Sequence, residues 1–130
     1  MSLIQKEIHD KGLTAPRVTP AAVEANIASE HYFNAWDGVT GESINHDGGL
    51  TSASQPQALK CLTICVLVLK NGFMVTGESA CASPENLDAD VGRKLARQHA
   101  VQKIWPLMGY SLRNHLSKKS RAKQSGTKEN

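Results

Sequence analysis

The chain has 130 residues, the size of one domain, and 40% of them are hydrophobic, which is enough for a core. The net charge is +3, and residues 118–130 hold five Lys and Arg against one Glu, so the excess positive charge lies in this tail. No apolar run approaches the roughly 18 residues of a membrane span, and the amino terminus lacks the apolar region of a signal peptide. These features exclude an integral membrane protein, and we expect the protein to lie in the cytoplasm.

The cysteines also restrict the class of protein. Cys61, Cys65 and Cys81 are odd in number and have no CxxC spacing, which disfavours a disulfide framework and a zinc site. We expect no metal and no cofactor.

The amino-terminal third predicts two helices. Residues 1–16 carry a short apolar set that fits one or two helical turns before Pro16. Thr19 then offers a capping side chain and Pro20 fits the first helical position. We predict a helix from there to about Phe33, followed by a polar, glycine-rich loop over residues 38–57 with a short edge strand around Ile44.

The centre of the chain predicts a β-hairpin. Residues 61–69 are apolar at every position except Thr63, which is typical of a strand that is covered on both faces. Asn71-Gly72 follows and suits a tight turn, and residues 73–79 form the return strand. With so few strands, we predict a helix on one face and a partner subunit on the other.

A long basic helix follows the hairpin. Ser83 offers a cap and Pro84 a first helical position, and Pro106 is expected to end the helix at about Trp105. A last short helix over residues 107–116 and a disordered tail complete the prediction. The predicted fold is α+β: a small antiparallel, hairpin-based sheet packed with helices, in an oligomer. Its parts are an N-terminal segment (1–16), one domain (17–117) and the tail (118–130).

A helical wheel separates two faces of this helix. Leu87, Val91, Leu95, Val101 and Trp105 gather on the side that we expect to meet the sheet, and Ala96, Ala100 and Ile104 lie opposite. Arg93 and Arg97 border that second side. Arginines around an apolar surface suit a nucleotide or a subunit interface, and the alternative is two solvated arginines on an exposed helix.

Two further side chains have both a functional and a structural interpretation. Phe73 opens the return strand, where its ring is either a stacking platform for a base or part of the core. Asn86 either contacts a base edge or holds the turn before the helix. No catalytic motif is present, so we expect no enzyme. The sequence His46-Asp47-Gly48-Gly49 favours a polar turn over a loop that carries a general base.

Two stretches carry a family resemblance: "RVTPAAVEANIASEHYFNAWDG" and "NGFMVTGESACASPENLDADVGRKLARQHAVQKIWPLMGYSLR". Together they resemble a family of small conserved phage and prophage proteins over residues 17–116. Leu87 and Met108 depart from the pattern, which has an aromatic and an acidic residue there. This family in turn resembles the first type of Thoeris anti-defence proteins.

The resemblance implies a sponge, which sequesters cyclic nucleotide immune signals without cleaving them. The signals are cyclic ADP-ribose isomers and, in some members, the cyclic di- and trinucleotides of the cyclic-oligonucleotide (CBASS) defence system. It implies α/β proteins that assemble as dimers or hexamers. The ligand-binding residues expected from it are, by residue type and position, Phe73, Asn86, Arg93, Arg97, Lys103 and Arg113.

Three other classes of function stay open, and the weakest of them is enzymatic cleavage of a cyclic nucleotide, which would alter the ligand. The basic tail and helix suit a nucleic-acid-binding protein, whose affinity would fall steeply with salt. An exposed apolar face suits a small phage protein that inhibits a host protein.

Overall fold

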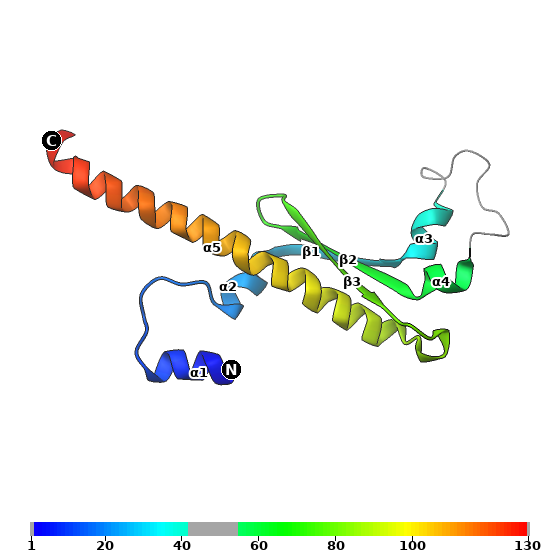
Figure 1. Ribbon diagram of the computed structural model, residues 1–130. Helices are drawn as coiled ribbons and strands as arrows, with labels where there is room; N and C mark the ends of the chain where they lie inside the picture. Colours follow the sequence, from blue (N-terminus) through cyan, green and yellow to red (C-terminus); the bar gives the residue numbers. More distant parts are fainter. Residues whose placement is uncertain (1, 42–54, 130) are drawn as a thin grey trace.

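A computed structural model describes residues 2–41 and 55–129, and the edge strand expected around Ile44 lies outside these ranges. Figure 1 shows one small sheet beside one long helix. The elements in chain order are α1 (Leu3–Asp10), α2 (Pro20–Ala25), β1 (Ile27–Asn34), α3 (Ala35–Thr40), α4 (Pro56–Lys60), β2 (Leu62–Leu69), β3 (Met74–Ala80), the 3-10 turn η2 (Pro84–Asn86) and α5 (Ala89–Glu129). The predicted α+β class, with an antiparallel hairpin-based sheet packed with helices, is confirmed.

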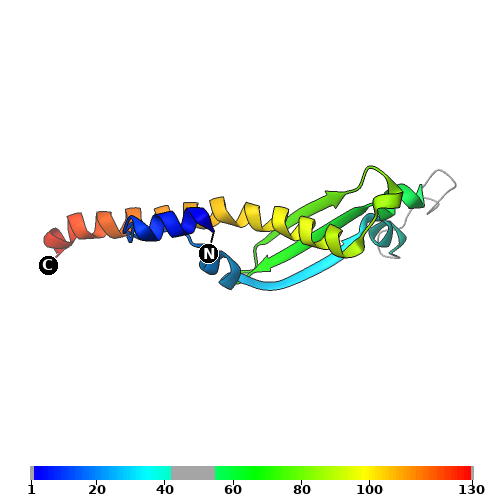
Figure 2. The same ribbon diagram turned by 90° about the horizontal axis from the view of Figure 1, so that it is seen from below.

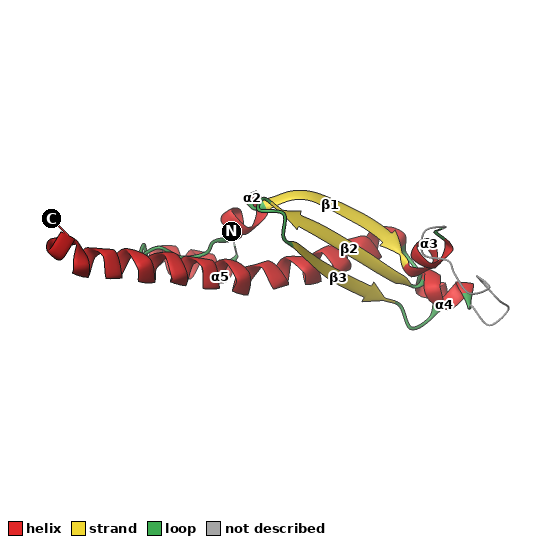
Figure 3. Cartoon of the chain, turned by 90° about the horizontal axis from the view of Figure 1, so that it is seen from above, coloured by secondary structure: helices red, strands yellow, loops and turns green. Residues whose placement is uncertain are grey.

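The sheet has the order β1-β2-β3, with antiparallel pairing throughout (Figure 3). Cys65 of β2 lies between Tyr32 of β1 and Gly77 of β3. The predicted hairpin is confirmed. Gly72 N donates to Leu69 O at 2.9 Å, and Gly72 has a φ of 90°, a conformation that glycine adopts without the steric cost of a Cβ.

The first strand corrects the sequence analysis. Thr19 caps α2 by accepting from Ala22 N, and Pro20 opens it, as predicted. However, α2 ends at Ala25, and residues 27–34 form β1 instead of more helix. Pairing with β2 supplies the backbone hydrogen bonds of this segment, and this tertiary contribution outweighs its local helix preference.

Two alanines and one isoleucine of α5 form the part of the helix that is buried against the sheet. Ala96, Ala100 and Ile104 are fully buried, whereas Leu87, Val91 and Leu95 are exposed. The predicted orientation was therefore wrong for these six residues, whereas Val101 and Trp105, which were predicted on the sheet side, are half-buried and pack against the core. The cause lies in Gly77 of β3, where a Cβ would stand 2.0 Å from Ala96 O and 2.3 Å from Ala100 N. The backbones meet so closely that only small side chains fit between them.

The end of α5 was also predicted wrongly. The helix passes through Pro106 to Glu129, so the expected stop at Trp105 and the separate last helix are absent. Residues 118–129, expected to be disordered, continue this helix, and its carboxy-terminal part extends beyond the sheet (Figures 1 and 2). A proline removes one N–H from the backbone hydrogen bonds of a helix, and here the helix continues on both sides of it.

The two faces of the sheet differ in burial. Along β2, Cys65, Leu67 and Leu69 lie under the helices and are buried, while Ile64, Val66 and Val68 on the other face are half-buried. Among the described residues no helix runs along this second face. The described part of the chain thus covers one face of β2. It does not cover the second face, where we predicted a partner subunit.

Candidate functional site

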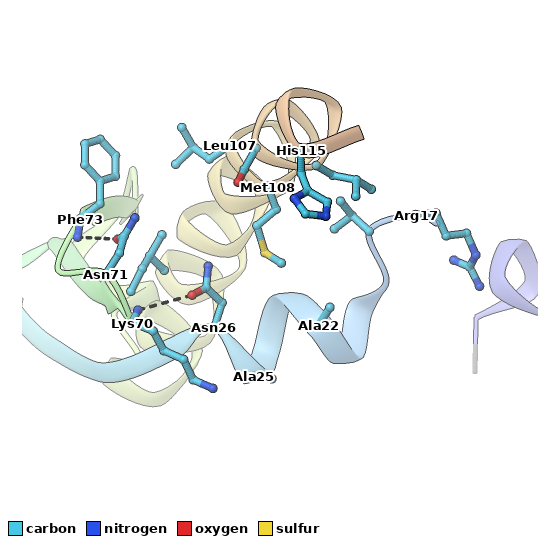
Figure 4. Close-up of a pocket in the computed structure, with 14 residues that line it drawn as sticks. Arg17, Ala22, Ala25, Asn26, Lys70, Asn71, Phe73, Leu107, Met108 and His115 are labelled. Carbon is cyan, nitrogen blue, oxygen red and sulfur yellow. Dashed lines mark hydrogen bonds between the residues drawn. The ribbon is translucent and has the colours of Figure 1, made fainter. Parts of the chain in front are cut away.

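A groove opens at the end of the sheet where the hairpin turns. It lies between α2, the turn of the β2–β3 hairpin and the middle of α5, and has a volume of about 860 Å³. Its apolar part comes from Val18, Leu69, Leu107, Met108 and Leu112. Polar side chains and one aromatic ring line the rest (Figure 4).

Backbone hydrogen bonds fix the hairpin side of the groove. Lys70 N donates to the backbone oxygen of Asn26 at 3.0 Å and lies 3.4 Å from Asn26 Oδ1, which joins the hairpin to the end of α2. Asn71 Oδ1 accepts from Phe73 N at 2.9 Å (Figure 4). This local bond holds the turn and presents Phe73 with 56% of its surface exposed.

The polar lining of the groove has one sign of charge. Arg17 and Lys70 are cations, and none of the described lining residues is acidic. Arg17 Nη1 donates to Gln5 Oε1 at 2.9 Å, and this amide partner carries no charge. An apolar wall with cations, two asparagine amides and an exposed ring suits an anionic ligand that also carries an aromatic base.

The structure brings only one of the six predicted ligand-binding residues into this groove, namely Phe73. Arg113 lies on α5 two positions before His115 but does not line the groove. Asn86 lies in η2 at the opposite end of the sheet (Figure 1). Arg93 and Lys103 are exposed along α5.

Arg97, the sixth predicted residue, has two acidic partners. Its Nη1 and Nη2 donate to both carboxylate oxygens of Glu24 at 3.0 and 2.7 Å, and its Nε donates to Glu30 at 3.1 Å. Hydrogen bonding to Arg97 lowers the pKa of Glu24. The guanidinium therefore joins α5 to α2 and β1, and a phosphate would have to displace these carboxylates.

The same network includes a half-buried tyrosine. Tyr32 donates from its hydroxyl to Glu30 Oε1 at 3.1 Å. Burial, and then this hydrogen bond, raise the pKa of Tyr32 to about 12. Tyr32 thus stays a neutral donor across the physiological range and helps to hold Glu30 beside Arg97.

Most of the polar residues that line the groove were not predicted from the sequence. Its overlooked polar members are Arg17, Asn26, Lys70, Asn71 and His115. Asn71 and Lys70 adjoin Phe73, so the turn itself was an available signal. His115 was hidden by the wrong assumption that Pro106 ends the helix.

Metal ligands do not gather in the described part of the chain. Residues 2–41 and 55–129 contain no cluster of three or more His, Cys, Asp or Glu side chains in metal-binding positions. None of the helices described is long and apolar enough to cross a membrane.

A comparison with protein families gives a match over most of the chain. The sequence model of the phage protein (N4 Gp49/phage Sf6 gene 66) family matches residues 18–116. The chain belongs to this family. The expected resemblance to small phage proteins is thereby confirmed. For this member of the N4 Gp49/Sf6 gene 66 family, the match runs from just before α2 to the middle of α5 and so covers the sheet and nearly all of the groove. No curated protein and no solved structure matches the chain.

Proposed function

We propose that this phage-family protein is an anti-defence sponge, which binds cyclic nucleotide immune signals and holds them without cleaving them. The signals are cyclic ADP-ribose isomers and, as a second group, cyclic di- and trinucleotides. The groove at the hairpin is the binding site. Its combination of an exposed Phe73 with Arg17 and Lys70, and with no acidic side chain in its described lining, carries the proposal.

Each part of a cyclic nucleotide has a partner of the right chemistry in the groove. Phosphates suit Arg17 and Lys70, which offer charged donors. A base suits the exposed ring of Phe73, because stacking on an aromatic side chain contributes roughly 1–3 kcal/mol. Asn26 and Asn71 offer amides, although each already accepts a backbone hydrogen bond. The volume of about 860 Å³ is in the range of small-molecule sites.

The affinity that a sponge needs argues for a second copy of the chain. To hold signals that are present at nanomolar to micromolar concentrations, a sponge needs a binding free energy of about −8 to −12 kcal/mol. Charge-assisted hydrogen bonds supply about 1.5–3 kcal/mol each when water is excluded, but the groove of a single chain is open to solvent. We therefore propose a dimer or hexamer. A contribution from Asn86, Arg93, Lys103 or Arg113 would come from a neighbouring copy, because these residues lie outside the groove of their own chain.

Two variants in the groove and one control variant outside it test whether the groove is the binding site. Phe73→Ala and Lys70→Gln are expected to weaken binding of glyco-cyclic ADP-ribose at least about tenfold in isothermal titration. Lys94→Gln removes an exposed lysine that pairs with Asp90 at 3.0 Å far from the groove, and should change little. Equal losses in all three variants would contradict the groove as the site.

A nucleic-acid-binding function is the second candidate, and the shape of α5 favours it. Its basic end carries Lys118, Lys119, Arg121 and Lys123 on a helix that extends beyond the sheet (Figure 1). Deleting residues 118–130 would abolish binding to DNA or RNA under this alternative. The same deletion leaves the sponge unchanged, since the groove ends at His115. A host protein that co-purifies with the chain, in the absence of any bound nucleotide, would favour inhibition of a host factor instead.

A further inference from the structure

Two of the three cysteines face each other at the open end of the hairpin. The β2–β3 register ends at Leu62 opposite Ala80, so Cys61 and Cys81 form the next pair. Cys81 N donates to Cys61 O at 3.3 Å, and the Cys81 sulfur lies 3.8 Å from the same oxygen. The two residues are 20 positions apart in the chain but adjacent in space.

The hydrogen bond from Cys81 N to Cys61 O predicts the backbone spacing that a disulfide needs. Opposite residues in a hydrogen-bonded antiparallel pair have Cα atoms about 5.5 Å apart. Disulfides most often join Cα atoms about 5.5–6 Å apart. Forming a bond between Cys61 and Cys81 therefore requires side-chain rotation and no movement of the strands.

A pocket gives small molecules access to these thiols. It has a volume of about 530 Å³ and is lined by both cysteines together with α4 and the segment that leads to η2. Cys81 is half-buried and Cys61 is buried. The third cysteine, Cys65, is fully buried and lies opposite Gly77, so it has no thiol partner across the β2–β3 pair.

We propose that Cys61 and Cys81 are a reversible thiol–disulfide pair, oxidised by low-molecular-weight disulfides such as glutathione disulfide. The Cys81 thiolate attacks one sulfur of glutathione disulfide and releases one glutathione thiolate. The Cys61 thiolate then attacks the Cys81 sulfur of the mixed disulfide and releases the second. Two protein thiols are oxidised, one glutathione disulfide is reduced to two glutathiones, and the two protein protons go to the released thiolates.

The order of the two attacks follows from exposure. Cys81 is the more accessible thiol and reacts first. A hydrogen bond with the Cys81 thiol, followed by burial, raises the pKa of Cys61, so Cys61 acts as the resolving thiol after Cys81 has been modified. The product would fix the start of β2 to the connection between β3 and α5. This inference does not depend on the proposed sponge function, because its test needs no nucleotide.

The test is oxidation of the purified full-length protein by excess glutathione disulfide, followed by alkylation and mass measurement. We expect the loss of two hydrogens, no retained glutathione, a peptide cross-link between Cys61 and Cys81, and recovery of the starting mass with dithiothreitol. A product that stops at a glutathione adduct, or that links two chains, would overturn the proposal.

Three serine or alanine variants make the assignment specific. Cys61→Ser should stop at a stable glutathione adduct on Cys81, and Cys81→Ser should lose most of the reaction. Cys65→Ala should react as the wild type does. Unchanged oxidation in Cys81→Ser would show that another pair, or a second chain, supplies the thiols.

Discussion

The side chain of Arg97 joins three elements through its hydrogen bonds. It holds Glu24 of α2 with a bidentate contact and Glu30 of β1 with its Nε. Arginine suits this position because its planar fork matches a carboxylate, which lysine cannot do. The residue type alone fits phosphate and carboxylate equally, so the sequence could not show that its partners are acidic side chains of the same chain.

This ion pair predicts a pH-dependent contribution to stability. Glu24 has a lowered pKa in the folded protein, so the unfolded chain binds a proton more readily as the pH falls past its ordinary value of 4.5. The contribution is complete above that pH and is lost as the pH falls through the folded pKa. We expect Glu24→Gln to lower the free energy of unfolding by about 1 kcal/mol near pH 7.

Urea denaturation at about pH 7 and about pH 3 measures this effect. The difference between wild type and Glu24→Gln should shrink at the lower pH. Glu7→Gln is the control, because it removes an exposed pair with Lys11 and should cost less than about 0.5 kcal/mol. A difference for Glu24→Gln that is the same at both pH values would contradict the role of this carboxylate.

Phe73 was the one residue of the groove that the sequence predicted as a ligand contact. Its position next to a turn was visible in the sequence, and the structure exposes its ring at the edge of a groove. Arg17 and His115 are 98 positions apart in the chain, and only the packing of α2 against α5 places them around one groove. No local pattern contains that information.

At the level of elements, the contact between α5 and β3 organises the fold. The helix lies on the strand through Gly77, Ala96 and Ala100. Bulky apolar residues usually mark the buried face of a helix, and this rule led to the wrong orientation. A glycine in the middle of a strand is the signal that a backbone approaches closely, and it identifies the small-residue face as the buried one.

Gly77→Ala tests this contact. The added methyl group would stand 2.0 Å from Ala96 O, so the helix must move away from the sheet. We expect the free energy of unfolding to fall by about 3 kcal/mol, measured by urea denaturation. Gly109→Ala has no atom within 4 Å of the new methyl group and should raise the free energy of unfolding by up to about 1 kcal/mol, because alanine favours helix. Equal changes in the free energy of unfolding for the two variants would contradict the close packing of α5 against β3.

The elements differ in how well their local signals predict them. The hairpin was predictable because an unbroken apolar run is followed by Asn71-Gly72. β1 was not, because a register shift between Ile27 and Ser29 places Ile27 and Tyr32 on the same core-facing side, so the sequence does not alternate regularly. The helical path through Pro106 was also unpredictable from the rule that proline ends a helix.

For the whole molecule, the second face of the sheet is an apolar surface along which no helix of the described residues runs. Ile64, Val66 and Val68 remain half-buried there, and Phe33 and Met74 are exposed. A second copy that covers this face would account for the apolar residues at alternate positions of β2. This is the surface through which we expect the proposed oligomer to form.

Val66→Glu tests the oligomer. A carboxylate at the centre of an apolar interface loses its hydration without gaining a partner. In sedimentation at micromolar concentration we expect the wild type to be a dimer or larger and this variant to shift to the monomer. Lys119→Glu, a charge change at the far end of α5, is the control and should keep the wild-type mass. A monomeric wild type would contradict the interface.

The central claim is that the protein captures a cyclic nucleotide and releases it intact. The most direct measurement is isothermal titration with glyco-cyclic ADP-ribose and a panel of cyclic di- and trinucleotides, followed by heat denaturation and chromatography of the released ligand. We expect submicromolar binding of at least one of them, recovery of the unaltered ligand, and loss of binding in Phe73→Ala. Absence of binding to every member of the panel, or recovery of a cleaved product, would contradict it.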